Sequence, residues 1–206
     1  MKQKFFIDSH KGATFFFVFI LITWFGQWGN HTALAYLALH GTYGFLWILK
    51  SRFFPDEAWE RPTGIPFGLC IWGSLCAYWI APWLITSRGI EAPAWYIGLF
   101  TIVYILGVFF HFASDMQKHI SLALRPGELI QDGLWARCRN PNYFGELLIY
   151  LGFSALAMHW IPVVALAAFV FGYWFPRMIE KDRVLARLPG FDEYKRHSKM
   201  FIPFVF

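Results

Sequence analysis

The feature that most restricts the fold of this chain is a series of long apolar segments separated by short polar connections. A helix that crosses the hydrocarbon core of a bilayer needs about 20 predominantly apolar residues, and helices satisfy their backbone hydrogen bonds internally. We therefore predict an all-α, polytopic membrane helical bundle of about six transmembrane helices. The six segments are 12–28, 32–49, 66–85, 95–113, 142–159 and 162–175.

Composition agrees with a membrane location. Charged residues make up 15% of the 206 residues, whereas soluble domains carry about 25%. A chain of this length suits one compact bundle, so we expect a single transmembrane domain over residues 1–206. No small-residue cleavage site follows the first apolar segment, which indicates a retained helix rather than a signal peptide.

The distribution of basic residues predicts the topology. With the N-terminus in the cytoplasm, 17 of the 18 Lys and Arg residues fall on the cytoplasmic side and only Arg88 lies outside. This pattern predicts that both termini are cytoplasmic, in a bacterial inner membrane or the endoplasmic reticulum, with the active site facing the cytoplasm. The net charge of +5 suits an anionic leaflet. We expect membrane lipids as partners and no nucleic acid, and the sequence does not indicate an oligomeric state.

The cysteine pattern and the absence of common motifs limit the chemistry. The three cysteines form no C-x-x-C pair, which argues against a disulfide framework and a cysteine zinc site. His111 and Asp115 are four residues apart, but no further ligands cluster with them, so we expect no metal. The chain has no phosphate-loop or G-x-G-x-x-G motif. A nucleotide would therefore bind outside the usual soluble folds.

The most informative stretch is 132–152, where basic and turn-forming residues run into an apolar helix. Arg137 and Arg139 precede Pro141, which suits the first turn of a helix. Glu146 lies about one turn inside that helix, where a lipid-facing carboxylate is costly, so it should face protein or a water-filled cavity. Arginines beside a helix start predict a site for a large anionic ligand.

Further polar groups lie on the predicted cytoplasmic side, each with an ordinary alternative. Side chains at the end of the 95–113 segment share a helical face and can hold ribose or amide groups, or can simply form a solvated helix end. The loop arginines can bind phosphates or anchor lipid headgroups. The tyrosine near Glu146 can belong to an aromatic belt, and the tail residues can belong to a solvated amphipathic helix. In chain order the groups are His111, Ser114 and Asp115; Arg125, Arg137 and Arg139; Asn142 and Tyr143; and Glu180, Arg183 and Arg187.

A second kind of site is expected on the 32–49 segment. Tyr36, His40 and Tyr43 have i, i+4, i+7 spacing and share one helical face. A histidine in the middle of a membrane helix is costly unless it has a partner. The stripe can donate a proton in a buried pocket, or it can make ordinary interhelical hydrogen bonds.

Two motifs carry a family resemblance. The run D-G-L-W-A-R-C-R-N-P-N-Y-F-G-E and the ending E-Y-K-R-H-S-K-M-F-I-P-F-V-F resemble the steroid 5-alpha-reductase C-terminal family, and the chain looks like a short DUF1295-like member. That group is similar to the sterol C14-reductases and to the isoprenylcysteine and phospholipid methyltransferases. The resemblance covers roughly 106–206 and implies a cofactor-binding C-terminal half there.

The resemblance also implies site residues. NADPH-binding roles fall on Ser114, Asp115, Arg125 and Asn142, with His111 where the reductases often have an Asn. The tail around Glu180, Arg183 and Arg187 would close over the cofactor. The segment L-A-L-H-G-T-Y resembles the helix that presents a catalytic tyrosine, with Tyr36 and Tyr43 as candidates.

Three functions follow as hypotheses. The leading one is an NADPH-dependent reductase of a lipophilic enone or sterol-like C=C bond that enters from the bilayer. Its catalytic residues would be Tyr43, Tyr36, His40 and Glu146, with phosphates on the loop arginines. The first alternative is an S-adenosylmethionine-dependent methyltransferase that acts on a prenylcysteine or a lipid amine. The second is a non-catalytic membrane protein that has kept the fold.

Overall fold

The computed structural model describes residues 1–206, and its regular elements are all helices apart from two isolated β-bridges. Short 3-10 and π segments interrupt or join the α-helices. The α-helices are α1 (Gln3–Trp24), α2 (His31–Tyr36), α3 (Thr42–Phe53), α4 (Ile65–Leu75), α5 (Ile80–Arg88), α6 (Ala94–Leu124), α7 (Pro141–Ser154), α8 (Trp160–Phe169), α9 (Phe175–Leu185) and α10 (Phe191–His197). The predicted all-α class is confirmed.

Five continuous helical stretches are long and apolar enough to cross a membrane, which indicates an integral membrane protein. Which side of the membrane each end occupies stays a prediction. The stretches are Gln3–Trp24, His31–Phe53, Ile65–Arg88, Ala94–Leu124 and Trp160–Leu185.

The predicted span 142–159 is not among these five stretches. Helix α7 has 14 residues and rises about 21 Å, less than the ~30 Å hydrocarbon core. A 3-10 turn follows it, and Met158 then adopts a left-handed conformation with φ 46°. Its neighbour is longer than predicted, because α8 continues through a π segment into α9 and reaches Leu185.

The chain divides into two compact units. Unit 1 contains residues 1–104 and 151–166, and unit 2 contains residues 105–150 and 167–206. The cofactor-binding half predicted over 106–206 stays a prediction, and most of its residues belong to unit 2.

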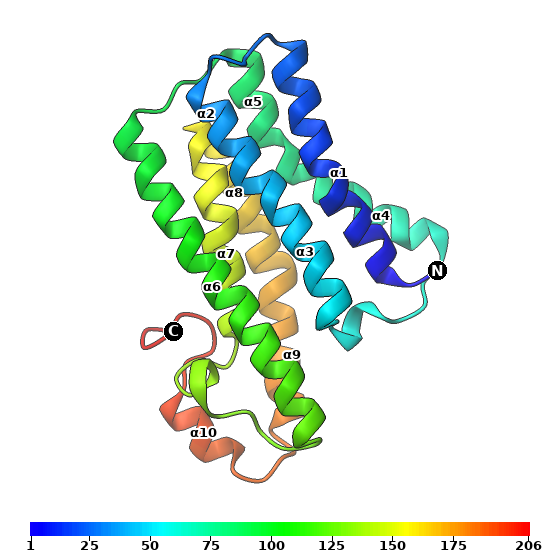
Figure 1. The fold of residues 1–206 in the computed structure, drawn as a ribbon. Coiled ribbons are helices and arrows are strands. Elements are labelled where there is room, and N and C mark those ends of the chain that lie inside the picture. The colour runs from blue at the N-terminus through cyan, green and yellow to red at the C-terminus, as the bar shows by residue number, and fades with distance from the viewer. The chain divides into compact units, whose positions relative to one another are not determined.

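In unit 1, helices α1 and α3 pack at very short range, and α4 lies along α1 as well (Figure 1). Gly44 makes the close approach possible, because a Cβ there would overlap the carbonyl oxygen of Lys11. Thr14, Val18 and Ile22 form the buried face of α1. A π-helix over Leu37–Gly41 joins α2 to α3.

In unit 2, the first part of α7 packs on α6 through two glycines. A Cβ on Gly107 would lie 2.6 Å from the amide nitrogen of Ile149, and one on Gly145 would overlap the backbone of His111. A small apolar cluster of Leu129, Phe191 and Tyr194 packs α10 against the loop after α6.

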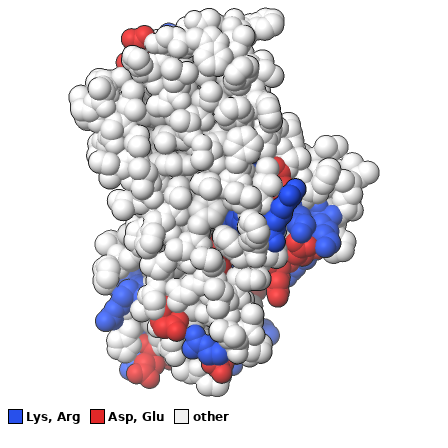
Figure 2. All heavy atoms as spheres, viewed as in Figure 1, with Lys and Arg blue, Asp and Glu red and all other residues white.

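The surface is largely uncharged. On the face shown in Figure 2, the Lys, Arg, Asp and Glu side chains gather in patches and leave broad areas without charge. Many of the exposed side chains are large and apolar, among them Phe16, Ile102 and Phe109. Such a surface suits contact with lipid chains.

Candidate functional site

The end of α6 and the start of α7 bring three predicted site residues together in unit 2. Asn142 donates from Nδ2 to Oδ1 of Asp115 at 3.0 Å, and its carbonyl oxygen lies 3.0 Å from Nδ1 of His111. His111 Nε2 and Asp115 Oδ2 are 3.9 Å apart. His111 and Asp115 are both buried. His111 and Asp115 lie on one face of α6, as their i, i+4 spacing predicted. Asn142, which follows His111 by 31 residues in the chain, contacts both of them.

Asn142 keeps one buried acceptor free of hydrogen bonds. Its Oδ1 atom has no partner in the structure, and a buried acceptor without a donor costs roughly 1–3 kcal/mol. A ligand amide or hydroxyl that donates to Oδ1 would remove that cost. The same cluster can therefore hold polar groups of a cofactor.

Ser114 has a different environment from the one expected of a ligand-binding hydroxyl. It is fully buried, and its Oγ donates to the carbonyl oxygens of Phe110 at 2.5 Å and His111 at 3.2 Å. Its own carbonyl oxygen accepts from Nε1 of Trp135 at 3.2 Å. Ser114 thus fixes the loop after α6 to the helix.

Arg139 is held by protein groups. Its Nε and Nη2 atoms donate to the Asp182 carboxylate, and Nη1 donates to the carbonyl oxygen (2.8 Å) and Oγ (3.1 Å) of Ser198. These bonds use four of the five N–H groups of a guanidinium. Lys181 donates to the carbonyl oxygen of Arg139 at 2.6 Å, so α9 and the 137–140 segment are tied together twice.

The other two loop arginines have different surroundings. Arg125 is exposed and pairs with Asp132 in its own loop at 3.0 Å. Arg137 is exposed. The three arginines predicted to hold phosphates therefore comprise one buried and two exposed side chains.

Glu146 is half-buried on α7, one turn from Tyr143, so it is neither fully exposed nor fully enclosed. The ring of Tyr143 packs against that of Trp174 with centroids 5.7 Å apart. On the same stretch of helix as Trp174, Arg177 donates to the Tyr173 hydroxyl at 2.9 Å. Acid, phenol and guanidinium groups thus lie along α7 and the start of α9.

The predicted tail residues lie on the surface. Glu180 and Arg183 form an exposed pair at 3.2 Å, and Arg187 is exposed one turn further on.

An open groove of about 560 Å³ runs over unit 2, within the range of small-molecule sites. Four cationic side chains and one carboxylate line it, together with an apolar wall. The cations suit phosphate groups. Sequence reasoning missed Lys195 and Lys199, although the basic run K-R-H-S-K marks them. The lining residues are Arg139, Arg183, Lys195, Lys199 and Asp182, with Ile179, Ala186, Phe191, Ser198, Met200, Val205 and Phe206.

Unit 1 contains the predicted Tyr/His stripe, and all three side chains are buried. The Tyr36 hydroxyl lies 2.7 Å from Nδ1 of His40 and donates to the carbonyl oxygen of Tyr78 at 3.2 Å. The His40 ring stacks on Phe153 with centroids 3.9 Å apart. The π-helix over Leu37–Gly41 places His40, and such segments often occur at functional sites.

Two charged residues of unit 1 were not expected at a site. Lys11 is buried on α1, with Nζ 4.3 Å from the centre of the Tyr43 ring. Asp8 lies one turn earlier and accepts a hydrogen bond from Trp47. The predicted span begins only at Gly12, whereas α1 begins at Gln3, so both residues lie on the helix and not before it.

Comparison with known proteins gives both a family and distant relatives. The family model described as "Protein of unknown function (DUF1295)" matches residues 73–196. The chain is 32% identical over 126 residues to 3-oxo-5-alpha-steroid 4-dehydrogenase 2 of Sus scrofa, covering 56% of this chain and 47% of that protein. It is 28% identical over 123 residues to the nickel-cobalt-cadmium resistance protein NccN of Alcaligenes xylosoxydans xylosoxydans, covering 58% and 57%.

A third relative belongs to the same kind of resistance protein. The chain is 36% identical over 77 residues to the cobalt-zinc-cadmium resistance protein CzcN of Cupriavidus metallidurans, covering 36% of this chain and 35% of that protein. The chain thus spans between about a third and somewhat more than half of the length of these relatives. It is distantly similar to a steroid dehydrogenase and to metal-resistance proteins.

Proposed function

This chain belongs to the DUF1295 family, and we propose that it is a membrane-embedded, NADPH-dependent reductase of a lipophilic enone or a sterol-like C=C bond. The observation that carries the proposal is the buried His111–Asp115–Asn142 cluster with its free Asn142 acceptor, in the same unit as a cation-lined groove. The distant similarity to a 3-oxosteroid dehydrogenase supports the choice of reaction.

The residues of unit 2 fit the polar groups of a dinucleotide. Oδ1 of Asn142 is available to a ribose hydroxyl or a carboxamide N–H. Arg183, Lys195 and Lys199 line the open groove and suit phosphates. Arg139 has one N–H left and acts mainly by holding Asp182 and Ser198 in place. We assign Glu146 to the reactive end of the cofactor.

The residues proposed as the acid belong to unit 1. Bound NADPH supplies a hydride for the β-carbon of the enone. The enolate that results needs a proton, and buried phenols in the Tyr36–His40–Tyr43 stripe can give one. These side chains are buried away from bulk water, which protects a hydride donor.

The proposal includes a topology. Because 17 of the 18 Lys and Arg residues fall on one side in the predicted arrangement, we place both termini and the groove of unit 2 at the cytoplasmic surface. A lipophilic substrate would then enter from the bilayer, and the cofactor from the cytoplasm.

A methyltransferase is the second candidate, and one observation favours it. Arg139, the best-placed arginine, is already bound by Asp182 and Ser198, and S-adenosylmethionine has no phosphates to hold. In this alternative, Glu146 and Glu180 would face its cationic sulfonium and ammonium groups. The acceptor would be a prenylcysteine or a lipid amine.

A cofactor titration separates the two candidates. Detergent-purified protein is heated with increasing NADPH, NADH or S-adenosylmethionine, and Tm is measured. A ligand at a hundred times its Kd stabilises by about 2.7 kcal/mol, and we expect NADPH to raise Tm most. Lys199→Glu should weaken the NADPH effect, whereas Arg88→Glu, at an exposed position of unit 1, should not. A larger shift with S-adenosylmethionine would overturn the reductase in favour of the methyltransferase.

A further inference from the structure

A polar seam runs between α1 and α3 in unit 1. On α1, Lys4, Asp8 and Lys11 have i, i+4, i+7 spacing and therefore share a face. On α3, Tyr43 and Trp47 share the face that meets them, because Trp47 contacts both Asp8 and Lys11. A row of ionisable groups inside a membrane protein is costly and usually marks a proton or ion route.

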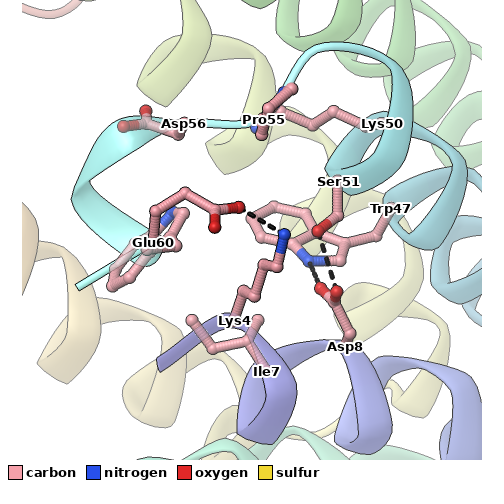
Figure 3. A pocket seen from close by; sticks show the side chains of 10 residues that line it. Lys4, Ile7, Asp8, Trp47, Lys50, Ser51, Pro55, Asp56 and Glu60 are labelled. Atoms are coloured by element: carbon pink, nitrogen blue, oxygen red, sulfur yellow. Dashed lines mark hydrogen bonds and ion pairs between the residues drawn. The ribbon is translucent and has the colours of Figure 1, made fainter. Parts of the chain in front are cut away.

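At the outer end of the seam, Asp8 is held in a defined orientation (Figure 3). Trp47 donates from Nε1 to Oδ1 at 3.0 Å, and Ser51 donates from Oγ to Oδ2 at 2.8 Å. Close by, Lys4 pairs with Glu60 in the loop after α3. Glu60 also binds Lys2, and the hydrogen bonds from Lys2 and Lys4 hold the pKa of its carboxyl below the usual range.

Asp8 also connects the seam with the surface. It lines a small cavity of about 10 Å³ together with Lys4, Ser51 and Glu60, which is room for about one water molecule. It lines an open groove of about 570 Å³ on the surface of unit 1 as well. The carboxylate therefore lies between bulk water and the interior of the helix pair.

At the inner end, Lys11 lies beside Tyr43. Its Nζ is 4.3 Å from the centre of the Tyr43 ring and 4.6 Å from that of Trp47. Lys11 is 3% exposed and Tyr43 is 0% exposed. The amine therefore lies over the face of the ring that carries the phenol group.

We propose that this seam is the path by which protons reach Tyr43, with Asp8 collecting them at the surface and Lys11 delivering them. This inference rests on the proposed reductase, in which each turnover consumes one proton at a buried site. It also chooses between the two tyrosines, because the Lys11 ammonium lies over the Tyr43 ring.

The proton steps balance. The Tyr43 phenol gives its proton to the enolate and becomes a phenolate. The Lys11 ammonium protonates that phenolate and becomes a neutral amine. The amine takes a proton from the Asp8 carboxyl by way of water, and Asp8 takes one from bulk water. The hydride and one solvent proton together add two hydrogens across the C=C bond.

The first test needs no substrate. The hydroxyl of Tyr43 is followed by infrared spectroscopy with ring-labelled tyrosine after dilution into D2O, and the difference from Tyr43→Phe isolates its band. We expect exchange to slow at least about tenfold in Lys11→Met and in Asp8→Asn. Arg88→Met removes a cation from an exposed position of unit 1 that lines neither the cavity nor the groove, and it should exchange like the parent protein. Unchanged exchange in both seam variants would overturn the path.

A second test uses turnover with NADPH and a 3-oxo-4-ene steroid. The first turnover uses the proton already on Tyr43, so Lys11→Met should keep the initial burst and lose about tenfold in the steady-state rate. Lys11→Arg keeps the charge but does not release a proton, so it should behave like Lys11→Met. A fully active Lys11→Arg would show that only charge matters and would overturn the relay. If the parent protein oxidises no NADPH with this steroid or other lipophilic enones, the proposed reductase fails, whereas the exchange result still decides the path.

Discussion

The Arg139 guanidinium and the Asp182 carboxylate meet with Nη2 and Oδ2 2.9 Å apart, although the two residues are separated by 43 positions in the chain. Both side chains are largely enclosed, with 6% and 14% of their surfaces exposed. A second bond from Nη1 reaches the Ser198 carbonyl oxygen. Arg139 thus joins α7's leading loop, α9 and the tail.

The first prediction concerns this pair. Arg139→Ala leaves the Asp182 carboxylate with its charge uncompensated, and breaking a buried pair typically costs about 3–5 kcal/mol. We expect a large loss of thermal stability in detergent. Asp182→Asn, which keeps the shape, should lose less. Equal stability of Arg139→Ala and the parent protein would contradict the role given to Arg139.

A matched exposed pair provides the control. Arg183 and Glu180 have side chains 73% and 65% exposed, and surface pairs contribute about 0–1 kcal/mol. Arg183→Ala should therefore leave stability nearly unchanged while weakening NADPH binding at the groove. Replacing Arg139 and Arg183 in turn by alanine thus distinguishes an arginine that stabilises the fold from one that binds the ligand.

The helical membrane class and the shared faces could be predicted because they depend on local spacing. His111 and Asp115 are one helical turn apart, and α6 continues past the apolar run to Leu124, so both lie on one helix. Tyr36 and His40 likewise meet at 2.7 Å. What spacing cannot show is a contact between distant segments, such as Asn142 with Asp115 or Arg139 with Asp182.

Other structural features could not be predicted because no local pattern in the sequence marks them. Asp8 and Lys11 precede the apolar run, and only the packing of α1 on α3 shows that they are part of a buried seam. The helical spacing of Tyr36, His40 and Tyr43 did not predict the π-helix over Leu37–Gly41. The predicted span 142–159 has enough apolar residues, but its helix ends at Ser154.

The second prediction tests the contact between α6 and α7. Gly145→Ala places a methyl group against the backbone of His111, and overpacking of this kind typically costs about 1–3 kcal/mol. A displacement of α7 away from α6 would also separate Asn142 from Asp115. Both the stability of the protein and its affinity for NADPH should therefore decrease. Gly172→Ala is the control, because nothing lies within 4 Å of a Cβ there. Equal Tm values for the two variants would contradict the close packing.

The third prediction concerns the cofactor cluster. Asn142→Asp removes the N–H that binds Asp115 at 3.0 Å and places two carboxylates side by side. Like charges at that distance repel, and a carboxylate oxygen at Oδ1 would meet the cofactor. We expect the Kd for NADPH, measured by isothermal titration, to rise at least about tenfold. Asn142→Ser, which adds no charge, should lose less, and the opposite order would argue against an electrostatic cause.

The fourth prediction is a pH dependence at Cys138. Burial raises the pKa of this thiol from 9.0 to about 11, and its Sγ donates to the Phe201 carbonyl oxygen. Burial also raises the pKa of Tyr194 in the same unit. Because the thiolate is the reactive form, only about 1% of Cys138 should react as thiolate at pH 9. In a Cys70→Ser/Cys76→Ser background, iodoacetamide labelling followed by mass spectrometry should stay slow at pH 9 and accelerate toward pH 11.

The same shift has a consequence for stability, and its sign follows from which state holds the proton more tightly. The folded protein keeps the Cys138 proton up to a higher pH than the unfolded chain, so the full stabilisation is present below about pH 9 and is lost as the pH rises through about 11. A difference of about two pKa units between the folded and the unfolded state corresponds to at most about 3 kcal/mol of folding free energy. Cys138→Ala removes the titrating group, so its Tm should fall less steeply between pH 9 and pH 11 than that of the parent protein. Parallel Tm curves for the two proteins over this range, or rapid labelling of folded Cys138 at pH 8, would show that the thiol is not buried as the structure places it.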